Sequence, residues 1–187
     1  MLEKNNFIEH YKYDLEVKYK DYLKYEMTIK PKLSQVLSLT LRDRLKFNRN
    51  QLHHVMQRLN QQITPNYNKE INHYKKIKAR SVIERQLKHE GLVHSHSILA
   101  IHKDIEDKFL KNFEIVDGKL FVRSDLMERR FYKLAEIECQ KLLTSKDVDR
   151  YLRYMFKKYK ADADDDGKLG DEFCFPASAI PSDINRS

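Results

Sequence analysis

Two periods of hydrophobic and polar residues divide the chain into helices and strands. Apolar residues recur at helical spacing in residues 6–30, 48–63, 104–113, 124–139 and 145–160. Residues 36–41 (VLSLTL), 77–87, 92–101 and 119–123 instead resemble strands, and 77–101 forms a hairpin around a turn closed by Gly91. The order of these elements predicts an α+β fold with a central, mainly antiparallel sheet flanked by helices.

Prolines and charge mark the boundaries of these segments. Pro31 ends the first predicted helix and Pro65 the second, because proline cannot donate a helical hydrogen bond. Residues 161–172 (ADADDDGKLGDE) are strongly acidic and precede a stretch with the last two prolines. We therefore expect an N-terminal helical extension at 1–33, one main domain at 34–160 and an acidic, flexible C-terminal tail at 161–187.

Composition favours a globular protein of a reducing compartment. The chain has 187 residues, 41% of them hydrophobic and 34% charged, and no apolar run approaches the roughly 20 residues of a membrane span. The first residues are charged throughout, unlike a secretory signal. Cys139 and Cys174 lack a CxxC partner, which fits the cytosol better than a disulfide framework. We expect no membrane partner and no small-molecule cofactor.

The net charge favours a polyanionic partner. It is +8 with a pI of about 9.3, and 11 tyrosines and 9 phenylalanines are available to stack on unpaired bases. The acidic segment also resembles a calcium-binding EF-hand loop, with Asp162, Asp164 and Asp166 in place. That match fails at Phe173, which stands where the closing glutamate belongs.

Two histidines occupy one face of the second hairpin arm. His94 and His96 are two apart in a predicted strand, so their imidazoles share a face and could reach one divalent cation. Glu84 on the opposite arm could add a carboxylate. The alternative is that histidines and serines line the wetter face of a half-buried strand.

The last predicted helix carries a tyrosine on its polar side. Val148, Leu152, Met155 and Tyr159 form the apolar stripe, whereas Tyr154 lies near Arg150, Lys157 and Lys158. A tyrosine there is either a solvated surface residue or a nucleophile for phosphoryl transfer, because lysine and a metal can neutralise the phosphate oxygens.

These motifs together resemble those of the HUH endonucleases, in particular the rolling-circle replication initiators of plasmids, phages and single-stranded DNA viruses. Three motifs follow in the family's order: a hydrophobic-Thr strand at 36–41, the His-x-His strand, and a Tyr-x-x-Lys helix at 154–157. Ser95 stands where the family has a bulky apolar residue. The resemblance implies an RRM-like HUH fold for residues 34–160.

The resemblance also implies a reaction and roles for residues. The protein would be a metal-dependent, sequence-specific single-stranded DNA nickase and strand transferase that acts through a covalent 5′-phosphotyrosine. His94, His96 and Glu84 would hold Mn²⁺ or Mg²⁺, with Glu90 as a substitute for Glu84. Tyr154 would be the nucleophile and Lys157 would orient the phosphate, while Tyr151 is a second, weaker candidate.

The same resemblance implies binding partners and leaves alternative functions. We expect single-stranded origin DNA to contact the histidine face with the help of Arg42, Arg44, Lys78 and Arg80. This sequence contains no phosphate-binding GxxxxGK[ST] loop, so we expect either a small initiator that relies on a host helicase or the nuclease part of a longer protein. The protein would act in the cytoplasm of a bacterial host, or in the host nucleus if its origin is a eukaryotic virus. The alternatives are a single-tyrosine transposase, a relaxase, or a basic nucleic-acid-binding module without catalysis.

Overall fold

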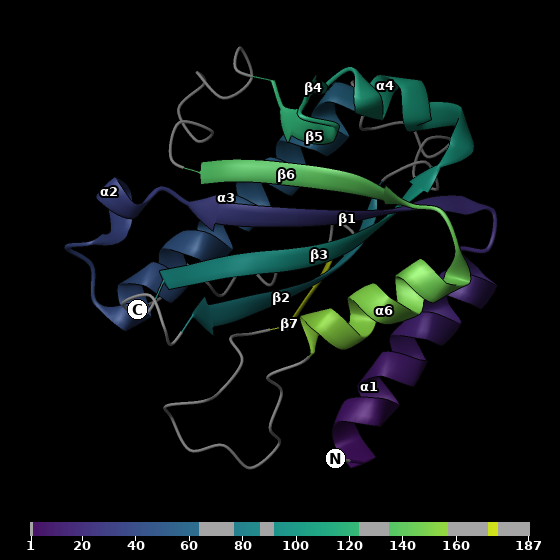
Figure 1. The fold of residues 1–187 in the computed structure, drawn as a ribbon, viewed down its shortest axis with the longest axis horizontal. Helices are drawn as coiled ribbons and strands as arrows, with labels where there is room; N and C mark the ends of the chain where they lie inside the picture. The colour runs from purple at the N-terminus through teal and green to yellow at the C-terminus, as the bar shows by residue number, and fades with distance from the viewer. Residues whose placement is uncertain (1, 64–76, 87–91, 124–134, 157–171, 176–187) are drawn as a thin grey trace.

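A computed structural model describes residues 2–63, 77–86, 92–123, 135–156 and 172–175 (Figure 1). Within them, a seven-stranded antiparallel sheet has the order β4-β5-β6-β1-β3-β2-β7. Its strands are β1 (Tyr22–Pro31), β2 (Lys78–Gln86), β3 (Leu92–His102), β4 (Phe113–Val116), β5 (Lys119–Val122), β6 (Ala135–Leu142) and β7 (Glu172–Phe175). The helices are α1 (Leu2–Tyr13), α2 (Leu33–Val36), α3 (Leu41–Ile63), α4 (Glu106–Leu110) and α6 (Ser145–Met155). The predicted α+β class with an antiparallel sheet is confirmed.

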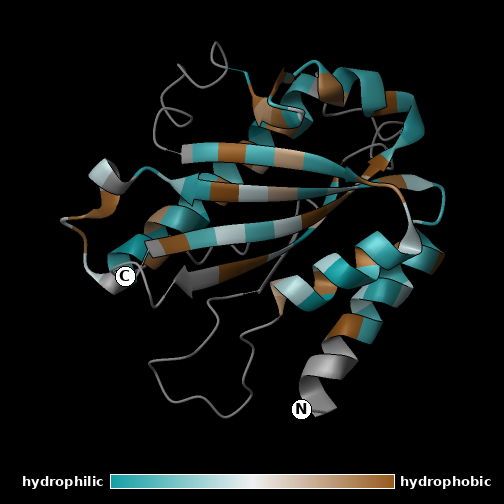
Figure 2. Cartoon of the chain, in the orientation of Figure 1, coloured by the Kyte–Doolittle hydropathy of each residue, from teal (hydrophilic) through white to brown (hydrophobic). Residues whose placement is uncertain are grey.

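Helices cover both faces of the sheet (Figure 1). One core joins α3 and α4 to the odd-numbered positions of β1 and β3, including Met27, Ile29 and Leu99. The other core joins α1 and α6 to the opposite face, with Ile98 and Leu152 at its centre. Figure 2 shows hydrophilic and hydrophobic residues mixed along these strands, as expected where the faces differ in their surroundings. Residue parity along β1 and β3 therefore decides which helix layer a side chain meets.

The helix predicted at 6–30 is confirmed in its first part and wrong in its last part. Helix α1 continues as a π-helical segment, η1 (Asp14–Lys18), and the chain then forms β1 from Tyr22. Along β1, Tyr25, Met27 and Ile29 are buried while the residues between them are half-buried, which is a period of two. Tertiary pairing with β3 and β6 outweighs the helical spacing of the earlier tyrosines. The sheet thus includes residues 22–31, which we had assigned to an N-terminal extension.

The strand predicted at 36–41 is wrong. These residues end α2, make a turn and begin α3. Thr40 caps α3: its Oγ1 accepts from the backbone N–H of Asp43 at 3.2 Å, and its carbonyl accepts from that of Arg44 at 2.9 Å. Leu37, on the expected dry face, is half exposed, at 50%. A local capping signal here outweighs a short alternating pattern.

The helix predicted at 124–139 is also wrong where it can be compared. Residues 135–139 belong to β6, which pairs with β1, while 124–134 lie outside the described residues. Ile137 and Cys139 are buried between the exposed Glu136 and Gln140, so the period is two. Cys139 is a buried free thiol.

The remaining predictions hold in outline. The hairpin is confirmed as β2 and β3, the helix at 48–63 as part of α3, and the segment 104–113 contains α4. Asp117 and Gly118, with φ of 50° and 76°, form the tight turn between β4 and β5. The last helix is confirmed as α6 through Met155. None of the described helices is long and apolar enough to cross a membrane.

The C-terminal tail differs from the expectation in one respect. Glu172–Phe175 forms β7, which pairs with β2 at the edge of the sheet, whereas we predicted an extended or disordered tail that does not join the sheet. The acidic residues 161–171 and the end of the tail, 176–187, lie outside the described residues.

Candidate functional site

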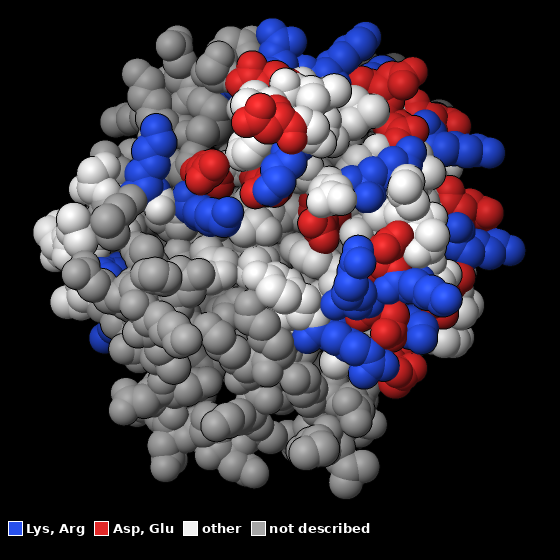
Figure 3. Space-filling view, viewed as in Figure 1, with Lys and Arg blue, Asp and Glu red and all other residues white. Residues whose placement is uncertain are grey.

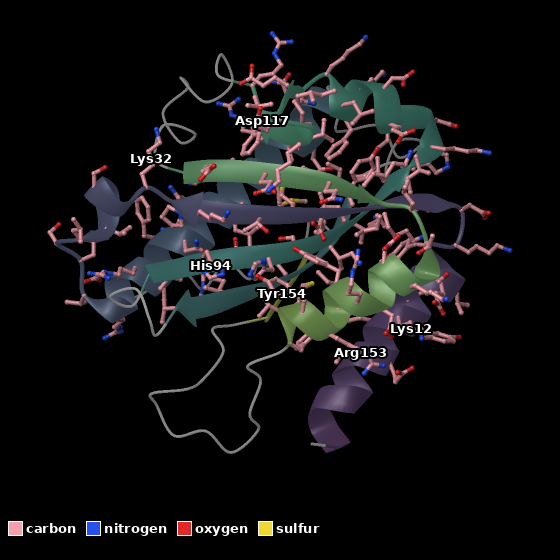
Figure 4. All side chains as sticks on the ribbon, in the orientation of Figure 1. Lys12, Lys32, His94, Asp117, Arg153 and Tyr154 are labelled. Carbon is pink, nitrogen blue, oxygen red and sulfur yellow. The ribbon has the colours of Figure 1, made fainter. Side chains whose placement is uncertain are left out.

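A pocket of about 520 Å³ lies between β1, β3, β6 and α6. Its lining includes Glu26, Thr28 and Lys30 from β1, His94 and His96 from β3, Glu138 and Gln140 from β6, and Arg150, Tyr151 and Tyr154 from α6. The sheet residues share one face because Thr28 is paired with His96 on one side and with Glu138 on the other. His94 on β3 and Tyr154 on α6 both line this pocket and are labelled in Figure 4.

The two histidines form the floor of the pocket. Their ring centroids are 4.7 Å apart with planes at 87°, and both side chains are nearly covered, at 7% and 3% exposure. His96 Nδ1 lies 3.2 Å from Thr28 Oγ1 in a hydrogen bond. Such a bond at one ring nitrogen sets the orientation of the imidazole, as outer partners do for histidines that bind metals.

The third predicted metal ligand is placed by its backbone alone. Glu84 on β2 pairs directly with His94 on β3. Its side chain lies outside the described part of the structure, and among the side chains that are described no three His, Cys, Asp or Glu residues gather as a metal site. Two adjacent imidazoles and a glutamate position opposite one of them are donor types that can ligate a divalent cation: imidazole suits transition metals, and a carboxylate suits Mg²⁺ or Mn²⁺.

Two tyrosines from α6 reach the pocket in different environments. The ring of Tyr154 lies 5.0 Å from that of His96, edge-on, and Tyr154 is 43% exposed. Tyr151 is stacked beside Tyr154 at 6.1 Å but is buried, and its hydroxyl donates to the carbonyl of Met27 at 3.4 Å. Burial, and then the nearby carboxylate of Glu26, raise the pKa of Tyr151 well above its ordinary value. Tyr154 is therefore the tyrosine that a ligand in the pocket can reach.

The other predicted site residues are not gathered at the pocket. Lys157 lies outside the described residues. Arg42 and Arg44 lie at the start of α3, behind the sheet, where the Arg44 guanidinium donates to the carbonyls of Leu37 and Leu39. On β2, Lys78 pairs with Ala100 and Arg80 with Ile98, farther along the sheet than the histidines.

Arg80 is held by the helix layer. Its Nη2 lies 2.9 Å from Asp14 Oδ2, and its guanidinium sits over the ring of Tyr11 at 5.0 Å from the centroid. These contacts attach α1 and η1 to the sheet. Arg80, which we expected at the DNA-binding face, is thus engaged in an ion pair and a cation–π contact.

Sequence reasoning missed the contribution of β1 and β6 to the pocket. Glu26, Thr28 and Lys30 were assigned to a helix, and Glu138 to another helix, so none was expected beside the histidines. The alternation of apolar Tyr25, Met27 and Ile29 with the polar residues between them was the sequence signal that could have identified β1.

Charge around the pocket is mixed. Lys30 and Lys119 both pair with Glu138, at 3.6 and 2.7 Å, and Arg150 pairs with Asp147 at 3.0 Å. Figure 3 shows acidic side chains among the basic ones across this face, with uncharged residues between them. The positive charge of the chain is therefore not concentrated into one patch among the described residues of this face.

Glu26 is the exception to this pairing. It is half-buried in the pocket and makes no hydrogen bond or ion pair with another described residue. Burial raises the pKa of its carboxyl, and the neighbouring carboxylate of Glu138 raises it further.

The fold and site define an antiparallel α+β protein with a histidine pair and an accessible tyrosine in one pocket. Comparisons with family models, with curated proteins and with solved structures found no match to this chain. The function must therefore be argued from the pocket itself.

Proposed function

We propose that this protein is a metal-dependent single-stranded DNA nickase and strand transferase of the HUH type, which initiates rolling-circle replication. The observation that carries the proposal is the approach of Tyr154 to His96, 5.0 Å between ring centroids, with His94 beside it in the same pocket. A phosphate held at the histidines would lie within reach of the tyrosine oxygen. In-line attack depends on such positioning.

The strand layout supports the same proposal. The His-x-His strand β3 lies next to β1, where Met27-Thr28-Ile29 has the hydrophobic-Thr pattern and Thr28 contacts His96. This strand, in place of residues 36–41, would serve as the first motif of an RRM-like HUH fold. The helix carrying Tyr154 packs across the histidine face of the sheet.

The chemistry divides between the metal ligands and the tyrosine. His94, His96 and, by its register position, Glu84 would hold Mn²⁺ or Mg²⁺, which supplies Lewis-acid stabilisation of charge on the phosphate oxygens. The Tyr154 oxygen attacks phosphorus, the bond from phosphorus to the 3′-oxygen breaks, and the 3′-oxygen leaves as a hydroxyl. The product is a 5′-phosphotyrosine, and a later 3′-hydroxyl can reverse the step to join strands.

The test is an adduct screen. Wild-type protein is incubated with pooled single-stranded oligonucleotides and Mn²⁺ and resolved on a denaturing gel, where a covalent protein–DNA band is expected. Tyr154→Phe deletes only the proposed nucleophilic oxygen and should remove the band. Tyr151→Phe is the matched control from the same helix and should retain it, since the Tyr151 hydroxyl donates to a backbone carbonyl.

Histidine variants test the metal site in the same assay. His96→Ala should abolish the adduct while leaving DNA binding, measured by filter retention, largely intact, because backbone charge contacts dominate affinity. His102→Ala changes a histidine at the far end of the same strand, where Nδ1 accepts from the Asp104 N–H, and should retain the adduct. DNA binding without any adduct in wild-type protein would favour a non-catalytic nucleic-acid-binding module instead.

A further inference from the structure

A carboxylate with no hydrogen bond or ion pair to another described residue is unusual in a pocket proposed to bind a polyanion. Glu138, the other described acidic residue of the pocket lining, pairs with Lys30 and Lys119, and Asp147 at the start of α6 pairs with Arg150. Glu26 alone makes no hydrogen bond or ion pair with the described residues. A negative charge at this position repels a phosphate and so weakens its binding. A role in the reaction would explain why a carboxylate is nevertheless present.

The position of Glu26 is set by three elements. On β1 it pairs with Ile98 of β3 on one side and with Gln140 of β6 on the other, so its side chain shares the face of Thr28 and His96. From α6, Tyr151 is close enough for the Glu26 charge to raise its pKa. Tyr154 stacks on Tyr151 and lines the same pocket, so Glu26 and the proposed nucleophile open onto one space.

The proposed reaction needs a proton acceptor. The Tyr154 hydroxyl carries a proton, and this proton must leave as the oxygen attacks phosphorus. The neighbouring Tyr151 hydroxyl is buried against the Met27 carbonyl and cannot serve. The side chains of Lys30 and Arg150 are hydrogen-bond donors without an acceptor atom, so they are unsuited to take the proton.

We infer that Glu26 is the general base of the reaction and accepts the Tyr154 phenol proton, directly or through one bound water. This inference rests on the proposed function. The Tyr154 O–H bond breaks as the oxygen–phosphorus bond forms, the proton moves to a Glu26 carboxylate oxygen, and the 3′-oxygen departs and takes a proton from solvent. In the joining direction, protonated Glu26 returns the proton to Tyr154.

The surroundings of Glu26 suit a base. Burial and then the charge of Glu138 raise the pKa of Glu26 above the ordinary value for glutamate. Arg150 and Lys119 partly offset this rise, and Asp147 makes the smallest contribution, which raises the pKa. A base works best when its pKa lies near the working pH. The groups that face it are thus Glu138 on β6, Lys119 on β5, Asp147, Arg150 and Tyr151 on α6, and the histidines on β3.

The test is a pH–rate profile of adduct formation at saturating Mg²⁺, with an oligonucleotide from the screen. The wild-type rate should level off once Glu26 is ionised. Glu26→Gln should be slower at neutral pH by about 100-fold. Its rate should keep rising about tenfold per pH unit where the wild type is level, because hydroxide must then take the tyrosine proton. Oligonucleotide affinity should stay equal or increase, since a negative charge is removed.

A matched control uses the neighbouring carboxylate. Glu138→Gln removes the same charge from the same pocket but from a residue already paired with Lys119 and Lys30. Its profile should level off like that of the wild type. Glu26→Asp, which keeps the carboxylate but retracts it, should restore the level region at a reduced rate.

The outcomes separate the two proposals. An adduct in wild-type protein together with a Glu26→Gln profile of unchanged shape, whatever its rate, overturns the role of Glu26 and leaves the nickase proposal standing. If wild-type protein forms no adduct with any oligonucleotide, both are overturned. Thermal unfolding of each variant shows whether a slow rate reflects loss of fold.

Discussion

Burial separates residues of the same type in this protein. Tyr151 and Tyr154 are one helical turn apart, yet one is 6% and the other 43% exposed, so only one can meet a ligand. The same holds for two carboxylates on the side of the sheet that α1 and α6 cover. Glu26 lies open to the pocket, whereas Asp14 is buried in a network with Arg80 and Lys18. The surroundings of a side chain, more than its residue type, decide whether it stabilises the fold or is accessible to a ligand.

Asp14 provides a prediction for stability. Burial by itself raises its pKa, but the hydrogen bonds and charges of Lys18 and Arg80 outweigh burial, so the pKa is lowered. Asp14→Asn should reduce the free energy of unfolding by about 2 kcal/mol at pH 7, measured by urea denaturation, since a charge-assisted pair is lost. A carboxyl with a lowered folded pKa stabilises above its unfolded pKa. That stabilisation disappears as the pH falls through the folded value.

The difference between wild type and Asp14→Asn should therefore narrow as the pH falls below about 5. Glu16→Gln is the control, because Glu16 lies in the same segment and is exposed. It should change stability by less than about 0.5 kcal/mol. Equal losses in the two variants would show that the Asp14 network does not hold η1 to the sheet.

At the scale of elements, helix α6 is specified by local sequence signals. Thr144 and Asp147 form a reciprocal capping box: Thr144 Oγ1 accepts from the Asp147 N–H at 3.2 Å, and Asp147 Oδ2 accepts from the Thr144 N–H at 3.0 Å. Its buried stripe of Val148, Leu152 and Met155 then packs on β3 and α1. The cap fixes where the helix starts, and so which residues face the pocket.

Removing the cap should destabilise the protein without unfolding it. Thr144→Ala leaves the first backbone N–H groups of α6 unsatisfied, and we expect a loss of about 1 kcal/mol in thermal or urea unfolding. Ser145→Ala changes the adjacent exposed hydroxyl, which does not form the capping box, and should be close to neutral. A cost for Ser145→Ala as large as that for Thr144→Ala would contradict the assignment of the cap.

At the scale of the whole molecule, the sheet lies between two helix layers (Figure 1). The pocket lies on one face of the sheet, beside α6, where this helix does not cover β1 and β6. Basic groups at this opening are Lys30, whose side chain is 50% exposed, and Arg150, at 78%. Arg80 lies instead under α1 and is paired with Asp14. If single-stranded DNA crosses the pocket, these two exposed groups would contact its phosphates.

Binding of single-stranded DNA should therefore weaken steeply with salt. In a titration by fluorescence anisotropy, log affinity against log salt should be linear, and Lys30→Gln and Arg150→Gln should each reduce the slope by about 1. Arg80→Gln should leave the slope unchanged and lower the unfolding temperature. A slope that falls with Arg80→Gln but not with Arg150→Gln would place the DNA on a different surface.

Local signals explain which elements the sequence could predict. The hairpin of β2 and β3, helix α3 and the start of α6 have turns, caps or long periodic patterns within a few residues. The sequence did not predict β1 and β6 as strands, because each is stabilised by partners distant in the chain: β1 pairs with β3 and β6. Their own patterns were short enough to match a helix as well. The strand prediction at 36–41 was wrong for the opposite reason: a local signal, the Thr40 cap, begins a helix there.

The sequence by itself determined that His94 and His96 share a face and that Tyr154 lies off the buried stripe of its helix, because both follow from the fixed periods of a strand and a helix. Only the tertiary structure decided that these groups meet, with 5.0 Å between the rings of His96 and Tyr154. The tertiary structure also places Thr28 and Glu26 in the same pocket as these groups. Register between strands is a long-range property that depends on the packing of both faces, and no local pattern in β1 specifies which residue will lie beside a histidine 68 positions later.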